Sequence, residues 1–365
     1  MRTKPYGTTG KQVSVIAFGG MRFEKPDDVG ASTALIRYAH SKGINYFDTA
    51  PYYCDDKSEP LFGQVLPHLP RDSFYVSTKS AEHTGEKLRA QLEHSLTRLR
   101  LDRIDFFHIW CLMSLEDWQS RRKGGVLEAA LRAQQDGLIR HIVCSSHLEG
   151  DGLATVLEEG NFAGVTLGYN AINFPYREAA VRRAGSRKLG IMAMNPLSGG
   201  LIPKNAERFA FLARPGDASV VAGALRFVVS DPDLTAALVG FSRVEEVDEA
   251  VAVGAEPPSD LEVLRAKLRE HIQDSYSDVC TGCQYCLPCP EGIPIPKYMD
   301  VSTTMRLAGG DRKQALERFK WHWSIQEDFA KRCTECGTCE ARCTQHLNII
   351  ERLKELPVPV MSAAE

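Results

Sequence analysis

Eight of the eleven cysteines fall in the last quarter of the chain, in two groups of regular spacing. The first group follows the pattern Cys-x2-Cys-x2-Cys-x2-Cys-Pro, and the second follows Cys-x2-Cys-x2-Cys-x3-Cys. In chain order they are Cys280, Cys283, Cys286, Cys289, Cys333, Cys336, Cys339 and Cys343. Thiolates at a spacing of three residues can wrap one face of an iron–sulfur cubane while the intervening amides hydrogen-bond to its sulfides. The spacing therefore predicts two [4Fe–4S] clusters.

Two other uses of clustered cysteines fit this pattern less well. A disulfide framework is typical of small secreted domains, and nothing in this sequence indicates export. Zinc also favours Cys-x2-Cys pairs, but zinc sites usually come as two separated pairs, whereas each group here is an unbroken run of four. Zinc is the less favoured alternative to iron–sulfur clusters.

The fourth cysteine of each run is the least certain ligand. In two-cluster ferredoxins this cysteine ligates the other cluster, so we expect the two ligand sets to exchange their last members. The predicted sets are Cys280, Cys283, Cys286 and Cys343 for one cluster, and Cys333, Cys336, Cys339 and Cys289 for the other. The first run has only two residues before its last cysteine, and Thr344 stands where proline usually follows the second run. Either departure could move a fourth ligand.

A second set of residues, Asp48, Tyr53 and Lys79, could carry out proton transfer. Tyrosine has an unperturbed pKa near 10, so it is a poor acid or base at neutral pH unless a nearby cation favours its ionised form. Lys79 could supply that cation, and Asp48 could orient Lys79 and keep it charged. Tyr53 would then be the general acid when a carbonyl is reduced and the base when an alcohol is oxidised.

These residues follow the second and third of eight apolar runs that alternate with longer amphipathic stretches. The runs are Val15–Phe18, Ile44–Phe47, Phe74–Ser77, Ile104–Trp110, Ile142–Cys144, Val165–Leu167, Ile191–Met194 and Ala236–Val239. Eight such repeats over about 250 residues predict an α/β fold of the (β/α)₈ TIM barrel type, whose active sites lie at the carboxyl ends of the strands. A doubly wound sheet is the alternative, but no Gly-x-Gly-x-x-Gly follows the first run.

The barrel pattern breaks after Gly254, where Pro257 and Pro258 follow, and a helical pattern then covers Asp260–Gln273. The predicted domains are a barrel over residues 1–256 and a helical linker over 257–278. A small, mainly helical, ferredoxin-like dicluster domain over 279–350 and a flexible tail over 351–365 follow.

The first 250 or so residues resemble the aldo-keto reductase family. The resemblance is carried by motifs that occur together, most of which are weak singly. They are Asp48-Thr49-Ala50-x-x-Tyr53, Ser77-Thr78-Lys79, Gly7-Thr8-Thr9-Gly10-Lys11, Gly19-Gly20, Asn195-Pro196-Leu197-x-Gly199-Gly200 and Gly240-Phe241-Ser242-Arg243. The whole chain is similar to the branch of that family in which the barrel precedes a C-terminal ferredoxin module. The resemblance implies an oxidoreductase that uses a nicotinamide cofactor.

One position departs from the family's catalytic tetrad. The family's histidine at the end of the fourth strand falls on Trp110 in this sequence, and His108 lies two residues earlier, on the same face but one layer deeper. An indole N–H can donate a hydrogen bond to a carbonyl oxygen but cannot carry a proton. His108 is either a second candidate that acts through water or a core histidine. Asp48, Tyr53, Lys79, His108 and Trp110 are therefore the catalytic candidates.

The resemblance also implies cofactor contacts at the strand ends. They fall on Ser145, Ser146, Met194, Pro196, Leu197, Gly199, Gly240, Ser242 and Arg243. Arg243 favours NADP(H) over NAD(H), because a guanidinium suits the additional phosphate. Thr166 and Ala250 stand where the family often has glutamine and asparagine, so the cofactor contacts are altered in part.

Charge and hydropathy limit the classes of partner and the location that we expect. A formal net charge of −3 without a long basic run gives no reason to expect nucleic acid. No apolar stretch reaches the about 18 residues needed to span a bilayer, and the N-terminus has no apolar segment typical of a secretory signal. The expected location is the cytoplasm.

Three functions are compatible with these features. In the first, the barrel transfers hydride between NADP(H) and a small carbonyl or alcohol compound, and the clusters are structural or sense redox state. In the second, the clusters pass single electrons from a donor protein to a substrate at the barrel mouth. In the third, the chain is a non-enzymatic electron-transfer or assembly partner with a degenerate barrel. A hydride carries two electrons and a cubane normally passes one, and no flavin signature is present to connect the two.

Overall fold

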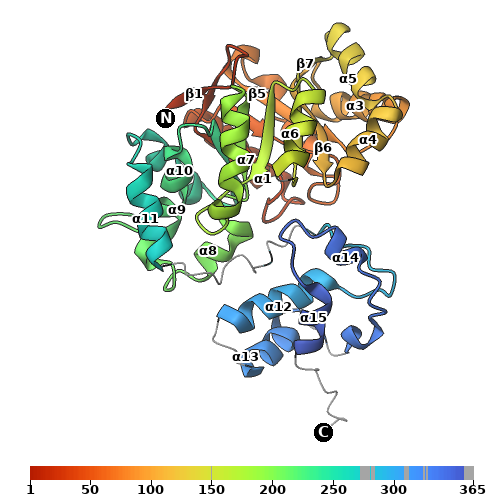
Figure 1. The fold of residues 1–365 in the computed structure, drawn as a ribbon. Coiled ribbons are helices and arrows are strands. Elements are labelled where there is room, and N and C mark those ends of the chain that lie inside the picture. Colours follow the sequence, from red (N-terminus) through yellow and green to blue (C-terminus); the bar gives the residue numbers. More distant parts are fainter. Residues whose placement is uncertain are drawn as a thin grey trace. The chain divides into compact units, whose positions relative to one another are not determined.

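The computed structural model describes residues 1–148, 150–271, 280, 284–307, 312–323, 325 and 328–356. The chain forms two compact units, residues 1–271 and 272–365 (Figure 1). Helix α11 (Leu261–His271) belongs to the first unit, which therefore extends past residue 256, where we expected the barrel to end. Arg265 on this helix lies 2.8 Å from Glu178 and 3.3 Å from the fully buried Asp231. These ion pairs hold the predicted linker helix against the barrel.

The first unit is a closed barrel of eight parallel strands, as predicted from the eight apolar runs. The strands are β3 (Ile16–Gly19), β4 (Tyr46–Asp48), β5 (Tyr75–Ser80), β6 (Ile104–Leu112), β7 (Ile139–Ser146), β8 (Gly164–Gly168), β9 (Gly190–Met194) and β10 (Ala236–Val239). Each strand pairs with the next in the chain, and β10 closes the barrel on β3. Parallel strands covered by helices on their outer face are buried, which explains why they read as nearly continuous apolar runs.

Helices connect the strands and surround the barrel (Figure 1). They are α1 (Val29–Ser41), α2 (Ser58–Gly63), α3 (Gly85–Leu99), α4 (Leu115–Lys123), α5 (Val126–Gln135), α6 (Gly150–Glu159), α7 (Phe174–Ser186), α8 (Leu201–Lys204), α9 (Val220–Ser230) and α10 (Val244–Ala255). The longest of them, α3, starts at Thr84, whose hydroxyl accepts the amide of Lys87, and ends at Arg100 in the left-handed conformation. Its leucines recur at helical spacing and face inward.

A short hairpin closes the end of the barrel opposite the strand carboxyl ends. Strands β1 (Thr3–Pro5) and β2 (Gln12–Ser14) form it, and Tyr6 between them is fully buried. The Tyr6 ring packs 4.1 Å from that of Phe106, and a Cβ at Gly164 or Gly190 would lie within 2.5 Å of it. Glycine at both positions therefore gives the tyrosine its space. Tyr6 and the hairpin fill this end of the barrel, so we look for the site at the other end, where the strands finish.

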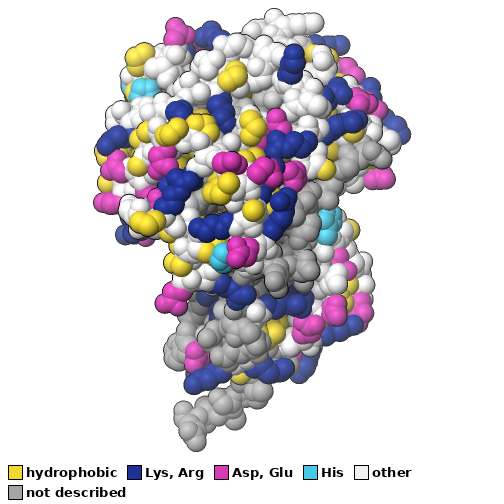
Figure 2. Space-filling model, turned by 60° about the vertical axis from the view of Figure 1, so that its left-hand side comes forward, with side chains coloured by type: hydrophobic (Ala, Val, Ile, Leu, Met, Phe, Trp, Pro, Cys, Tyr) yellow, Lys and Arg dark blue, Asp and Glu magenta, His cyan; other side chains and the backbone are white. Residues whose placement is uncertain are grey.

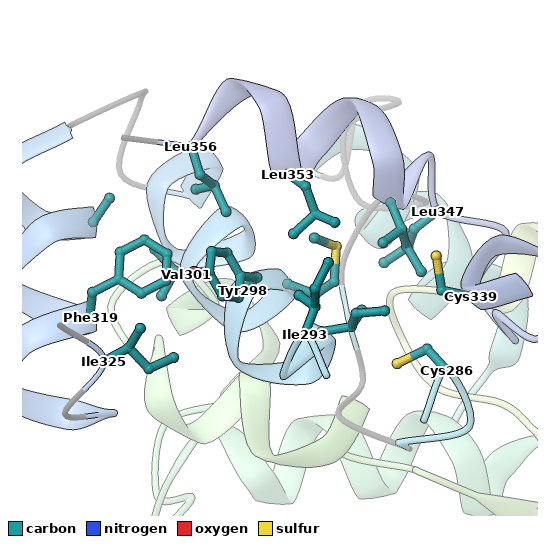
Figure 3. Packing of buried hydrophobic residues seen from close by; sticks show 14 residues of the cluster. Cys286, Ile293, Tyr298, Val301, Phe319, Ile325, Cys339, Leu347, Leu353 and Leu356 are labelled. Atoms are coloured by element: carbon teal, nitrogen blue, oxygen red, sulfur yellow. The ribbon is translucent and has the colours of Figure 1, made fainter. Parts of the chain in front are cut away.

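The second unit is helical where the structure describes it. Its helices are α12 (Ile295–Leu307), α13 (Arg312–Glu317) followed by a π-helical turn (Arg318–His322), α14 (Thr338–Ala341) and α15 (Ile349–Glu355). Its core runs from Phe319 and Ile325 to Leu347, Cys286 and Cys339 at the opposite end (Figure 3). We expected a flexible tail from residue 351, but α15 extends to Glu355, and Leu353 and the following Leu356 pack in this core. Residues 357–365 lie outside the described part of the chain.

Among the described residues, no helix combines the length and the apolar character that crossing a membrane requires. On the face shown in Figure 2, lysine and arginine side chains of the barrel alternate with aspartate and glutamate and form no broad field of one sign.

Candidate active site

A buried ion pair lies where β4 and β5 end. Lys79 Nζ is 2.6 Å from Asp48 Oδ1 and donates a second hydrogen bond to the carbonyl oxygen of Thr49 at 2.8 Å. The hydroxyl of Ser77 also donates to Asp48 Oδ1, at 2.5 Å. The two charged side chains are 4% and 6% exposed. Burial lowers the pKa of Lys79, and the charge of Asp48 opposes that shift. The carboxylate thus keeps a cation in a site that would otherwise disfavour it.

Tyr53 lies beside this pair, in the loop between β4 and α2. Its ring centroid is 5.2 Å from Lys79 Nζ, so the ammonium faces the ring, and the hydrogen bonds of Lys79 go to Asp48 and Thr49 instead. Burial raises the pKa of Tyr53 well above its usual value, and the negative charge of Asp48 adds to the rise. The sequence led us to expect Lys79 to favour the ionised phenol. In this arrangement the phenol is held in its neutral form, which is the proton-donating form.

Trp110 also contacts the Tyr53 ring. The two rings meet edge to face, with centroids 5.7 Å apart and an interplanar angle of 84°. The carbonyl oxygen of Trp110 accepts a hydrogen bond from Arg121 Nη1 at 2.9 Å, and Arg121 is in turn paired with Asp117 on the same helix, α4. The next residue, Cys111, has a φ of 58°, and the strand register shifts here. The indole is thus fixed at the reacting face by contacts on its own backbone.

His108 does not reach Tyr53. Its side chain is fully buried inside the barrel, and its Nε2 lies 3.0 Å from Thr166 Oγ1 on β8. Burial, with a smaller contribution from the cation of Lys79, lowers the pKa of His108 well below its usual value. His108 is therefore a neutral imidazole inside the barrel, opposite Lys79 in the register of β5 and β6. Thr166, which stands where the family often has glutamine, serves as its partner.

The residues expected to contact the cofactor differ in whether they already make hydrogen bonds within the chain. The hydroxyl of Ser145 accepts the backbone amide of Cys111 at 2.8 Å, while that of Ser146 donates to the Leu112 carbonyl and accepts the amide of Leu148. Each hydroxyl therefore already has a partner within the chain. Met194 ends β9 and is half-buried.

Two backbone segments after β9 and β10 contain the residues expected to contact the cofactor phosphates. Beyond Pro196 and Leu197, the turn has Ser198, Gly199 and Gly200 in succession at positive φ. Within this turn the amides of Ser198 and Gly200 already donate to the carbonyl oxygens of Asn195 and Leu197, at 2.9 and 3.1 Å. After β10, Gly240 and Ser242 are exposed, and Arg243 is 70% exposed as the N-cap of α10. At this end, however, Glu246 accepts the amide of Ser242 at 2.8 Å and lies 3.4 Å from Arg243 Nε.

Five cysteines from both groups line one cavity in the second unit. They are Cys286, Cys289, Cys333, Cys336 and Cys339. The cavity thus brings the last cysteine of the first group to the first three of the second group. Cys280 and Cys343 are half-buried beside the same core, and Cys283 lies outside the described residues.

The donor set fits an iron–sulfur cluster. No three of the described His, Cys, Asp and Glu side chains are close enough to hold a single metal ion. Each thiolate of a cubane binds a different iron atom, so its ligands stand farther apart. Hydrogen bonds from Thr338 lower the pKa of the exposed Cys336 thiol, whereas burial raises the pKa of Cys339 to about 11.

Comparison with known proteins agrees with both units. Residues 15–267 match the model of the aldo/keto reductase family, which is more than half of the chain. The chain belongs to this family. Residues 279–348 match a second model, the 4Fe-4S dicluster domain. The predicted combination of an aldo-keto reductase barrel with a C-terminal ferredoxin-like iron–sulfur domain is confirmed, as is the prediction of an oxidoreductase.

Curated relatives of this aldo-keto reductase align with its barrel. L-galactose dehydrogenase of Arabidopsis thaliana is 27% identical over 282 residues, which cover 68% of this chain and 87% of that protein. D-threo-aldose 1-dehydrogenase of a Pseudomonas species is 25% identical over 270 residues, which cover 62% of this chain and 80% of that protein.

Solved structures show the same fold. An aldo-keto reductase of Bacillus halodurans superimposes with a TM-score of 0.66 at 19% identity, covering 75% of this chain and 97% of that one. An aldo-keto reductase of Klebsiella pneumoniae in complex with NADPH gives 0.63 at 21% identity, covering 74% and 95%.

One further residue at the active end of this aldo-keto reductase, Asn170, was not predicted from the sequence. Asn170, after β8, is fully buried and donates from Nδ2 to the carbonyl oxygen of Asn195 after β9, at 3.0 Å. Its Oδ1 accepts the amides of Ile172 and Asn173, which fixes the turn. An asparagine directly after a buried strand, followed three residues later by another, is the signal that could have identified this turn.

Proposed function

We propose that the chain is an NADP(H)-linked oxidoreductase that reduces a small carbonyl compound or oxidises the corresponding alcohol, with Tyr53 as general acid or base. The buried Asp48–Lys79 pair against the Tyr53 ring is the observation that carries this proposal. A charged lysine buried beside a phenol has a clear use in acid–base chemistry. The phenolate that forms when Tyr53 gives up its proton is a negative charge, and Lys79, with Nζ 5.2 Å from the ring centroid, is a cation able to stabilise it.

Carbonyl reduction fits the protonation state of the site. When bound, the nicotinamide would supply the hydride, and the alkoxide that forms on the substrate needs a proton. Tyr53 holds that proton, because burial raises its pKa well above the usual value. Trp110 adds a hydrogen-bond donor, its indole N–H, on the face that its ring shares with Tyr53. In the oxidation direction the phenol would first have to lose its proton.

The residues at the strand ends fit a dinucleotide. The turn from Pro196 to Gly200, with three successive left-handed residues, would lie against the pyrophosphate, although the amides of Ser198 and Gly200 already donate to the carbonyl oxygens of Asn195 and Leu197. Arg243 is exposed and would accept the additional phosphate of NADP(H) once its pair with Glu246 opens. Ser145 keeps its own O–H free to donate to a carboxamide while its oxygen holds the Cys111 amide.

For the second unit we propose two [4Fe–4S] clusters, held by the exchanged ligand sets given above. Cys289 shares a cavity with Cys333, Cys336 and Cys339, as the second set requires, and Cys286, which we assign to the first set, lines the same cavity. We propose a structural or redox-sensing role for the clusters, because a cubane normally passes one electron whereas a hydride carries two.

Trp110 favours one alternative. Without the family's histidine, the site has lost a residue that can carry a proton, and a one-electron reduction fed by a donor protein through the clusters would need that residue less. In this second function the substrate still binds at the barrel mouth, but turnover depends on a low-potential donor.

One set of assays separates the functions. Anaerobic oxidation of NADPH is followed with a panel of small aldehydes, using the native protein, Tyr53→Phe and Cys336→Ala. Hydride transfer predicts turnover with NADPH, its loss in Tyr53→Phe and its survival in folded Cys336→Ala. Electron delivery predicts turnover only with dithionite-reduced ferredoxin and its loss in Cys336→Ala. A chain that acts only as an electron-transfer or assembly partner would show no turnover that Tyr53→Phe could abolish.

A further inference from the structure

The loop that carries Tyr53 has an unusual backbone. Tyr52, Cys54, Asp55 and Asp56 all have φ between 52° and 69°, in the left-handed region. None of the four is glycine, and L-residues with a side chain are disfavoured there because Cβ approaches the backbone. A segment with several such residues persists only when surrounding contacts hold it. Because Tyr53 lies within this loop, contacts that hold the loop also hold Tyr53.

Arg98, in the last turn of α3, makes the contacts that hold the loop. Its Nη1 donates to Asp56 Oδ1 at 3.1 Å, and its Nη2 donates to the carbonyl oxygen of the same residue. Asp56 Oδ1 also accepts the backbone amide of Tyr52 at 2.9 Å. One guanidinium therefore fixes both the backbone and the carboxylate at one end of the loop, and that carboxylate fixes the other end.

The same guanidinium also connects to the strand of Lys79. Its Nε lies 3.5 Å from Glu59 Oε2, and Glu59 is fully buried at the start of α2. The other oxygen of this carboxylate accepts the hydroxyl of Thr78 at 2.6 Å, and Thr78 precedes Lys79 on β5. Arg98 thus lies between the loop of the proposed acid and the strand of the cation that would stabilise its conjugate base.

The position of Arg98 is itself fixed. A Cβ at Gly63, the last residue of α2, would lie 2.1 Å from the carbonyl oxygen of Arg98, so the two helices meet with their backbones in direct contact. The Arg98 side chain is only 14% exposed. A rigid support, a nearly buried guanidinium and two carboxylates on separate elements are the features of a positioning device.

We infer that Arg98, acting through Asp56 and Glu59, is a positioning residue that sets Tyr53 against Lys79 for proton transfer. This inference rests on the proposed role of Tyr53. Without Arg98 the loop relaxes toward right-handed conformations and carries the phenol away from the reacting oxygen. Substrate and cofactor binding depend less on the loop backbone than proton transfer by Tyr53 does. We therefore expect kcat to fall while the KM for NADPH stays unchanged.

The test compares Arg98→Ala with Arg89→Ala, a matched control. Arg89 lies on the same helix and pairs with two carboxylates, Glu93 at 2.7 Å and Asp136, but has no contact with the loop. With NADPH and p-nitrobenzaldehyde as the probe, we expect kcat of Arg98→Ala to fall about tenfold and Arg98→Lys to recover part of the loss. We expect Arg89→Ala to match the native protein.

A rescue variant separates positioning from general stability. Asp55 is exposed and left-handed, so Asp55→Gly relieves backbone strain without removing an ion pair. In the double variant with Arg98→Ala, Asp55→Gly restores kcat if the loss of activity comes from the changed conformation of the loop backbone. Amide hydrogen exchange over residues 52–58 provides a measurement that needs no turnover: exchange rises in Arg98→Ala and falls again in the double variant.

Two results would overturn the inference: unchanged exchange over residues 52–58 in Arg98→Ala, or a kcat equal to that of Arg89→Ala. If the native protein turns over no aldehyde, the proposed function fails by itself, and the exchange measurement alone decides whether Arg98 holds the loop.

Discussion

The indole of Trp110 meets the phenol ring of Tyr53 edge to face, with ring centroids 5.7 Å apart. In this aldo-keto reductase the tryptophan takes the position where the family's proton-carrying histidine is expected. Its backbone is held by Arg121, so the ring is a fixed part of the site. The remaining polar contribution of this side chain is one N–H donor.

Replacing Trp110 with phenylalanine is expected to lower kcat/KM for aldehyde reduction about 100-fold. The reason is the loss of a hydrogen-bond donor to the oxygen on which charge develops. Trp110→His is expected to retain activity, because an imidazole N–H replaces the indole donor. Steady-state kinetics with NADPH and p-nitrobenzaldehyde measure both. Tyr52→Phe is the control, since Tyr52 is 63% exposed beside the site. Full activity in Trp110→Phe would show that Trp110 is a spacer.

The Asp48–Lys79 pair predicts a loss of both stability and activity when its carboxylate is neutralised. Asp48→Asn leaves the ammonium of Lys79 buried without a counter-charge, which costs about 3 kcal/mol in the free energy of unfolding. The pKa of Lys79, which burial lowers and Asp48 raises, falls further, so the cation is lost at a lower pH. Urea unfolding followed by circular dichroism under argon measures the stability.

Asp27→Asn is the control for Asp48→Asn. Asp27 pairs with Lys57 at the surface, where an ion pair contributes little. An equal loss of stability in the two variants would contradict the importance of burial at the Asp48–Lys79 pair.

The barrel and the ion pair could be predicted from the sequence for simple reasons. Buried parallel strands read as apolar runs, and their carboxyl ends meet at one rim, so Asp48 and Lys79 after neighbouring strands had to lie close together. The rest depends on contacts between distant residues. Helix α11 belongs to the barrel through Arg265 and the buried Asp231, a partner that no local pattern indicates. A loop of left-handed residues without glycine, as around Tyr53, has no sequence signature.

His108 predicts a pH dependence of stability. Burial and the cation of Lys79 lower its pKa well below 6.5, so the folded protein keeps it neutral while the unfolded chain takes up a proton. Because the unfolded state then binds more protons, stability falls as pH drops below about 6.5, by up to about 1.4 kcal/mol per pH unit. We expect His108→Gln to reduce this dependence between about pH 6.5 and 5. Urea unfolding at several pH values measures it.

The exposed His68 provides the control for this pH effect. His68→Gln is expected to leave the slope of stability against pH as in the native protein. If His108→Gln keeps that slope too, His108 is protonated in the folded barrel, and its hydrogen bond with Thr166 has another arrangement.

The proposed exchange of fourth ligands between two clusters predicts which iron is lost with which cysteine. Cys289 lines the cavity with Cys333, Cys336 and Cys339, so Cys289→Ala is expected to disturb the cluster held by the second group. The iron content then falls from about eight to about four atoms per chain, with the remaining signal belonging to the cluster of Cys280 and Cys286. Iron analysis and electron paramagnetic resonance of the dithionite-reduced protein, prepared anaerobically, measure this.

The control is Cys54→Ala, which changes a cysteine of the barrel and keeps all iron. A double variant Cys289→Ala/Cys333→Ala that loses no more iron than Cys289→Ala would place both thiols on one cluster, whereas loss of all iron would show that Cys289 serves the cluster of its own group.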